Sequence, residues 1–205
     1  MSTVLMTGFE PFGQRSLNSS WLAVSLLAQT WQGRAELVTR CLPVTFEGCG
    51  LVLRRAVRTV HPDVLIGVGE AAGRTHLTPE LVGINWDDAA IPDNAGAQPR
   101  QEYIEPGGPA ARFTGLPIYQ AVERMRGAGI PARVSLSAGS YVCNHVMYTI
   151  GGLVEASAGR LTGGFCHLPQ APEQVVDPDL PTMSSQLAAQ GLGILLETTL
   201  ESLQV

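Results

Sequence analysis

The sequence predicts an α/β protein: a single domain over residues 1–205, folded as a three-layer α/β/α sandwich around a mostly parallel sheet. Short apolar, β-branched segments alternate with longer amphipathic segments, as in folds whose parallel sheet is covered by helices on both sides. Hydrophobic residues make up 45% of the chain and charged residues only 15%, which is typical of a compact globular protein. Residues 63–68, DVLIGV, form a continuous apolar run, as expected of a strand buried on both faces.

The first half of the chain alternates strands and helices. We expect strands at residues 3–7, 35–44 and 63–68, with helices at about residues 18–31 and 46–60 between them. Gly8 ends the first strand, and a loop rich in glycine and proline follows it up to Gly13. Asn18 or Ser19 then caps the first helix, because either side chain can accept a hydrogen bond from the free N–H groups of a helix start.

The second half repeats this alternation after a long excursion. Residues 70–112 are rich in Gly, Pro, Asp and Asn and contain one expected strand, at residues 81–84; a connection this long with so little regular structure is usually functional. Beyond it we expect helices at residues 116–126, 143–156 and 183–202, and strands at residues 132–137 and 164–167. In a parallel sheet the C-terminal ends of the strands share one edge, which is where such folds bind ligands.

Composition and charge exclude several classes of protein. The formal net charge is −5 and no basic cluster stands out, so no nucleic-acid partner is expected. No apolar run reaches the roughly 18 residues that span a bilayer, and the N-terminus lacks the basic and apolar parts of a signal peptide. We therefore expect no membrane association and a cytoplasmic location. The four cysteines, Cys41, Cys49, Cys143 and Cys166, have no zinc-site spacing, so neither a metal nor another cofactor is predicted.

Cys143 and the histidines that follow it supply the thiol and imidazole groups that a nucleophilic hydrolase needs. Cys143 starts a predicted helix, where free backbone N–H groups and the helix dipole stabilise a thiolate and can donate to an oxyanion. His145 is a poor base for this thiol, because positions i and i+2 of a helix point about 200° apart, and we expect it to be structural. His167 ends the next predicted strand and so reaches the same sheet edge as Cys143. Cys166 points to the opposite face of that strand and is expected in the core.

A catalytic histidine is usually oriented by a third group, most often a carboxylate. Five acidic residues of the long excursion are candidates for this role: Glu70, Glu80, Asp87, Asp88 and Asp93. Glu80 is well placed by topology, but the pattern of residues leaves the choice among the five open. The two remaining histidines, His61 and His76, are expected to be solvated.

The chain resembles the pyroglutamyl peptidase I (pyrrolidone-carboxylate peptidase) family, cysteine hydrolases that remove an N-terminal pyroglutamate. The matching segments, in the family's order, are VLMTGFEPFG with the NSSW that follows, GVGEAAGRTHLTPELVGIN, IPDNAG, GGPAARFTGLP, SAGSYVCNHVMY and GGFCHLPQAPEQ. Each segment is moderately specific alone, and together they cover nearly the whole chain, with the weakest match at the C-terminal end. The resemblance implies that residues 1–205 form a single catalytic domain.

The same resemblance implies roles for individual residues. The family's nucleophile falls on Cys143, its base on His167 and its orienting carboxylate on Glu80. Its ring pocket falls on six residues: Phe9, Phe12, Asn18, Ile91, Tyr141 and Val142. An aromatic clamp with a few polar groups suits a lactam ring, which is a flat apolar body with one N–H and one C=O. The implied substrates are peptides with an N-terminal pyroglutamate, the implied assembly is a homotetramer, and no cofactor is implied.

Two positions depart from the pattern of the bacterial family members. Glu70 stands where they carry Gln, which adds a negative charge near the expected pocket, and Ala90 stands where they carry Arg, which removes a positive one. Neither departure touches Cys143, His167 or Glu80. Two other functions stay open as alternatives: a thiol acyl hydrolase with a different small amide or ester substrate, and a binding protein without catalytic activity.

The expected reactive form pairs a Cys143 thiolate with a protonated His167. Free Cys and His have pKa values of about 8.5 and 6.5, which would leave almost no ion pair at any pH. We therefore expect the helix terminus to lower the pKa of the thiol and Glu80 to hold the imidazolium.

Overall fold

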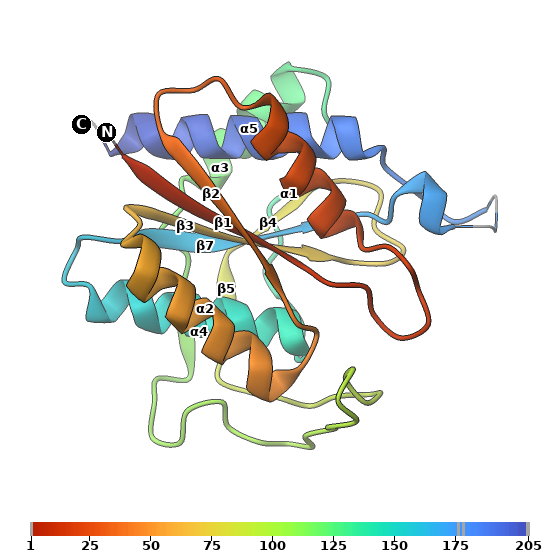
Figure 1. The fold of residues 1–205 in the computed structure, drawn as a ribbon, viewed down its shortest axis with the longest axis vertical. Helices are drawn as coiled ribbons and strands as arrows, with labels where there is room; N and C mark the ends of the chain where they lie inside the picture. The colour runs from red at the N-terminus through yellow and green to blue at the C-terminus, as the bar shows by residue number, and fades with distance from the viewer. Residues whose placement is uncertain (1, 176, 178, 204–205) are drawn as a thin grey trace.

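The computed structural model describes residues 2–175, 177 and 179–203 and is built around a five-stranded sheet (Figure 1). In spatial order the strands are β2 (Glu36–Leu42), β1 (Thr3–Phe9), β3 (Val64–Glu70), β7 (Thr162–Leu168) and β4 (Thr78–Glu80). The first four run parallel, and β4 pairs with β7 in the antiparallel direction. The C-terminal ends of β3 and β7 therefore lie side by side, with β4 against β7 at the edge of the sheet.

Helices cover both faces of this sheet. On one face lie α1 (Ser19–Thr30), α3 (Ile118–Gly127) and α5 (Ser185–Ser202); on the other lie α2 (Phe46–Val60) and α4 (Val142–Ala156) (Figure 1). The buried residues divide in the same way, since Val4 and Met6 of β1 pack on the α1 and α5 side and Leu5 packs on the α2 and α4 side. The predicted three-layer α/β/α fold is confirmed. None of these helices is long and apolar enough to cross a membrane.

The first loop and helix follow the prediction with one correction. Asn18 caps α1, and its Oδ1 accepts a hydrogen bond from the N–H of Ser20 at 3.0 Å. Strand β1, however, does not stop at Gly8 but continues to Phe9. A Cβ on Gly8 would lie 2.9 Å from backbone atoms of Trp21. The glycine therefore marks the close approach of α1 to the strand, and not the end of the strand.

The long excursion is ordered and attached to α4. The predicted strand at residues 81–84 is shorter than expected: β5 (Val82–Ile84) pairs with β6 (Ala111–Phe113) in a separate two-stranded sheet, while β4 joins the main sheet. The side chain of Asn144 holds the end of β5, because its Oδ1 accepts from the N–H of Ile84 and its Nδ2 donates to the carbonyl of the same residue, each at 2.9 Å.

Several predictions in the second half are wrong. Helix α3 begins at Ile118, two residues later than predicted. Residues 132–137 do not form a strand, although two isolated parallel bridges connect them to the region of β4. The pairing stays short because β4 itself has three residues, and because Pro79 and Pro131 have no N–H to donate. Helix α5 begins at Ser185, two residues later than predicted, since the side chain of Ser184 caps its first turn.

Candidate active site

The strand β7 places His167 and Cys166 on opposite sides of the sheet. Cys166 is fully buried in the core beneath α1 and α5, as predicted. Phe165 packs in the core beneath α2 and α4, and the His167 ring follows on the same face, with its centroid 5.0 Å from that of Phe165. In the neighbouring strand β3, the residue opposite His167 is Gly69.

Glu80 meets His167 because β4 runs antiparallel to β7. Thr78 pairs with His167 and Glu80 pairs with Phe165, which brings the carboxylate beside the imidazole. The Nδ1 atom of His167 lies 2.7 Å from Oε1 of Glu80, and both side chains are almost fully buried. Arg74 donates from Nη1 to the same carboxylate oxygen, also at 2.7 Å. Because Nδ1 is engaged by Glu80, Nε2 is the nitrogen of His167 that is left for chemistry.

Cys143 is the second residue of α4 and lies over the end of β3. Its Sγ stands 2.8 Å from the point where a Cβ on Gly69 would be, so a side chain at that position would displace the thiol. Gly69 is thus needed for a close approach and not for a turn. Since Gly69 pairs with His167, the thiol reaches the sheet next to the imidazole. The N–H groups of the first turn of α4 have no partner within the helix, and its N-cap residue, Tyr141, supplies no side-chain hydrogen bond.

The charges of the three groups differ from the expected ion pair. Burial raises the pKa of the Cys143 thiol to about 12, and the charges of Glu80 and Glu70 act in the same direction. Burial also lowers the pKa of His167, although Glu80 opposes this shift. For Glu80, burial opposes ionisation, but the hydrogen bonds from His167 and Arg74 hold its pKa below the usual value. These shifts favour the neutral thiol and the neutral imidazole, and they favour the ionised form of the Glu80 carboxylate. The predicted lowering of the thiol pKa is wrong.

A cavity of about 680 Å³ opens above Cys143. All six residues predicted for the ring pocket line it: Phe9, Phe12, Asn18, Ile91, Tyr141 and Val142. The aromatic rings meet edge to face, with the Phe12 and Tyr141 centroids 5.7 Å apart. The lining also includes Arg15, Glu70 and Asp88, which bring charge to the cavity wall. The first of these is a residue that the sequence did not single out, because only the folded loop turns it toward the cavity.

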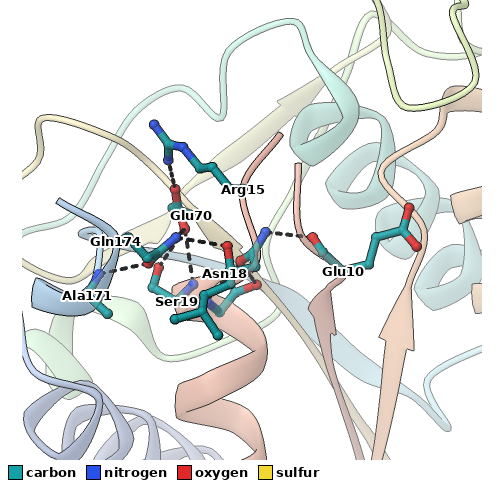
Figure 2. Close-up of polar contacts among 9 residues, drawn as sticks. Glu10, Arg15, Asn18, Ser19, Glu70, Ala171 and Gln174 are labelled. Atoms are coloured by element: carbon teal, nitrogen blue, oxygen red, sulfur yellow. Dashed lines mark hydrogen bonds and ion pairs between the residues drawn. The ribbon is translucent and has the colours of Figure 1, made fainter. Parts of the chain in front are cut away.

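The other four candidate carboxylates are engaged elsewhere. Asp93 accepts from the N–H of Phe46 at 2.8 Å and from two residues of its own loop. Asp88 forms an ion pair with Arg100. Glu70 contacts the first loop and the start of α1 (Figure 2). Asp87 contacts His145, which is described next. Among the described residues, Glu80 is the carboxylate that contacts His167.

His145 forms a pair of its own, as its expected structural role requires. Its Nδ1 lies 2.7 Å from Oδ2 of Asp87, and the pair joins α4 to the long excursion. Of the two remaining histidines, His61 is exposed at the end of α2, as predicted, whereas His76 is half-buried and contacts the hydroxyl of Thr75. Within residues 2–175, 177 and 179–203, no three His, Cys, Asp or Glu side chains converge as a metal site would require.

Known proteins with similar sequences and structures all have names of one peptidase family. A family model described as pyroglutamyl peptidase matches residues 2–202. A pyrrolidone-carboxylate peptidase from Streptomyces coelicolor is 47% identical over 96% of this chain and 91% of its own length. The crystal structure of pyroglutamyl peptidase I from Bacillus amyloliquefaciens superimposes with a TM-score of 0.93 at 43% identity, covering 97% of each chain. The pyrrolidone carboxyl peptidase from Thermococcus litoralis superimposes with a TM-score of 0.95 at 33% identity, covering 100% of this chain and 96% of its own.

Proposed function

The chain belongs to the pyroglutamyl peptidase family, and we propose on this premise that it is a cysteine exopeptidase that hydrolyses the amide bond after an N-terminal pyroglutamyl residue. We assign Cys143 as the nucleophile, His167 as the general base and acid, and Glu80 as the orienting carboxylate. One set of contacts carries this assignment. Glu80 contacts His167, and His167 pairs in the sheet with Gly69, over which the Cys143 thiol lies.

The cavity above Cys143 suits the pyroglutamyl ring. Phe9, Phe12 and Tyr141 provide aromatic surface for the flat lactam, and Val142 and Ile91 add apolar contact. Asn18 brings polar groups to the same wall. With the ring among these residues, the scissile carbonyl lies near the Cys143 thiol, which lines the same cavity.

The mechanism starts from the neutral thiol and neutral imidazole that burial favours. As Sγ of Cys143 attacks the pyroglutamyl carbonyl carbon, its proton passes to Nε2 of His167, and Glu80 stabilises the imidazolium that forms. The carbonyl oxygen becomes an oxyanion, for which the free N–H groups at the start of α4 are suitable donors. Collapse of this intermediate breaks the C–N bond while His167 gives its proton to the leaving amine. Water, deprotonated by His167, then hydrolyses the thioester and releases pyroglutamate and the free thiol.

Hydrolysis of pyroglutamyl-coumarin amide by the wild type and by Cys143→Ser tests the function. We expect turnover by the wild type and near-complete loss in the variant. A panel of other aminoacyl-coumarin amides and small esters distinguishes the alternative thiol acyl hydrolase, which would cleave one of these in preference. Folded wild-type protein that cleaves none of them would instead be a binding protein.

The setting of the enzyme is inferred from the family resemblance. We propose that residues 1–205 form one catalytic domain, that the protein is cytoplasmic, and that it assembles as a homotetramer whose partners are pyroglutamyl peptides and neither nucleic acid nor membrane. Light scattering coupled to gel filtration tests the assembly, since a monomeric mass at micromolar concentration would contradict a homotetramer.

A further inference from the structure

Glu70 connects several segments of the chain near the site, and it has no role in the proposed chemical steps. It ends β3, directly after the glycine beneath the Cys143 thiol, and its side chain is only 12% exposed. Across the sheet it is opposite Leu168, the residue that follows His167. Its backbone thus belongs to the strands that carry the catalytic groups, while its carboxylate points away to other segments (Figure 2).

Every hydrogen-bond partner of this carboxylate is a donor. Oε1 accepts from Nη1 of Arg15 at 2.7 Å. Oε2 accepts from the backbone N–H of Ser19 at 3.0 Å, from the hydroxyl of the same residue at 3.2 Å and from Nε2 of Gln174 at 2.6 Å. A glutamine at this position would have one acceptor oxygen and one donor NH₂ group. Its NH₂ group would therefore lie against donors, either Arg15 on one side or Ser19 and Gln174 on the other. The surroundings of Glu70 therefore require a carboxylate.

The charge of Glu70 also matches the elements that it joins. Helix α1 has no acidic residue in its first turn, and Glu70 places a negative charge at that positive helix end from a neighbouring strand. Arg15 balances this charge from the loop between β1 and α1, where its side chain is 45% exposed. Gln174, which follows the catalytic strand β7, donates both to Glu70 and to the carbonyl of Leu17 in the same loop.

The first loop forms one wall of the cavity, because it carries Phe12 and ends at Asn18. Its other side is held independently of Glu70: the side chain of Asn94 donates to the carbonyl of Pro11 at 2.9 Å, and its Oδ1 accepts from the N–H of Gly13 at 3.0 Å. The stretch from Arg15 onward is held by Glu70 and Gln174. Loss of the carboxylate would thus release Arg15 and the N–H of Ser19, while Gln174 still donates to Leu17 and Asn18 still donates to the carbonyl of Glu10.

We propose that Glu70 is a positioning residue: its carboxylate fixes the first loop and the start of α1 against the ends of β3 and β7, and so sets the distance between the ring-binding wall and Cys143. This inference rests on the proposed function, since the wall is assigned to the pyroglutamyl ring. It predicts that loss of the carboxylate weakens substrate binding and does not slow the reaction of the thiol, because the charge of Glu70 raises the pKa of Cys143.

The test compares Glu70→Gln with Glu173→Gln, a matched control. Glu173 is an exposed carboxylate next to Gln174, so its substitution makes the same change in charge close to the same segment. For each protein we would measure kcat and KM on pyroglutamyl-coumarin amide, together with the rate at which iodoacetamide alkylates Cys143. We expect Glu70→Gln to raise KM about 10-fold while kcat stays within about threefold of wild type. The alkylation rate should not fall, because loss of the charge lowers the pKa of the Cys143 thiol. Glu173→Gln should change none of these quantities.

Arg15→Gln removes the other partner of the ion pair with Glu70, which is the more exposed one. This variant serves as the test if Glu70→Gln does not fold. It should raise KM in the same direction. In the double variant the increase should be smaller than the product of the two single effects, because two neutral amides can pair. An unchanged KM in either single variant, or an equal increase in Glu173→Gln, would overturn the inference while wild-type turnover leaves the function standing. Absence of wild-type turnover would overturn the function, and the inference with it.

Discussion

Two histidine–carboxylate pairs lie in different regions of the molecule and share one geometry. His167 with Glu80 and His145 with Asp87 each join Nδ1 to a carboxylate oxygen at 2.7 Å. The side chains of the first pair are 5% and 0% exposed, and those of the second are 18% and 7% exposed. Distance and burial alone therefore do not separate a catalytic pair from a structural one.

The difference lies in what each imidazole has on its other side. His167 is beside Gly69, over which the Cys143 thiol lies. The Nε2 of His145 instead lies 3.6 Å from the point where a Cβ on Gly50 would be, in the contact between α4 and α2. One pair can pass a proton to a nucleophile, and the other holds the long excursion on α4. The comparison teaches that the open nitrogen of a histidine, and not its paired one, identifies its role.

The largest expected effect is the loss of the catalytic base. His167→Ala should keep its fold and lose about 10²- to 10⁴-fold in kcat/KM, because no group then takes the thiol proton. His145→Ala is the matched control and should keep most of its activity. Assays of both variants on pyroglutamyl-coumarin amide, with circular dichroism to verify folding, check the prediction. A folded but inactive His145→Ala beside an active His167→Ala would reverse the two roles.

Gly69 and Gly50 lie against the two regions and provide a second comparison. Gly69→Ala places a Cβ 2.8 Å from Sγ of Cys143 and from the ring of Phe165, and a displacement of about 1 Å at the reacting atom can cost about 10²-fold in rate. Gly50→Ala meets only the ordinary contact with His145 and should stabilise α2 by about 0.5–1 kcal/mol without loss of activity. Kinetic assays and thermal melts distinguish them. Full activity in Gly69→Ala would show that the thiol does not depend on this close approach.

The two carboxylates test how charge acts on each histidine. Glu80→Gln removes a charge-assisted hydrogen bond of about 1.5–3 kcal/mol, which corresponds to about 10- to 100-fold in rate. Because burial lowers the pKa of His167 and Glu80 raises it, loss of the charge should lower that pKa further. The protonated imidazole cannot accept the thiol proton, so the acid limb of kcat/KM should move to lower pH.

Asp87→Asn is the matched variant for this pH profile and should leave the acid limb in place. Since burial raises the pKa of the thiol to about 12, no alkaline limb from Cys143 is expected near neutral pH in either variant. A Glu80→Gln profile that loses its alkaline side instead would show that the resting site holds a thiolate and an imidazolium.

The last expected effect concerns the free energy of unfolding and not activity. His145→Ala leaves the buried carboxylate of Asp87 without its partner, which should lower the free energy of unfolding by about 1–3 kcal/mol. Denaturant unfolding monitored by tryptophan fluorescence measures this change. A variant as stable as the wild type would show that Asn144, which also holds β5, is sufficient to attach the excursion.

The parts that could be predicted from the sequence are those with local signals. The limits of α2, the cap of α1 at Asn18 and the layered fold follow from short-range patterns and hold in the structure. Cys143 and His167 follow from their places at the start of a helix and the end of a strand. The choice of Glu80 needed the family resemblance, because the antiparallel register of β4 on β7 leaves no local trace.

Other features could not be predicted because they depend on long-range packing. The expected shift of the Cys143 pKa followed from its place in a helix, but burial, which no local pattern reports, has the opposite and larger effect. The partner of His145 and the donors around Glu70 come from segments that are distant in the sequence. The predicted strand at residues 132–137 failed for a related reason, since its partner strand proved to be only three residues long.

The position of β4 has a consequence for the order of folding. In the five-stranded sheet β4 is an edge strand next to β7, which the chain supplies much later, so β4 joins this sheet only through β7. The strands β1, β2 and β3 pair over shorter separations and close their loops at a lower entropic cost. The carboxylate that completes the site is therefore installed late. A nascent chain therefore lacks the complete pair of Glu80 and His167 until almost all of its sheet has been synthesised.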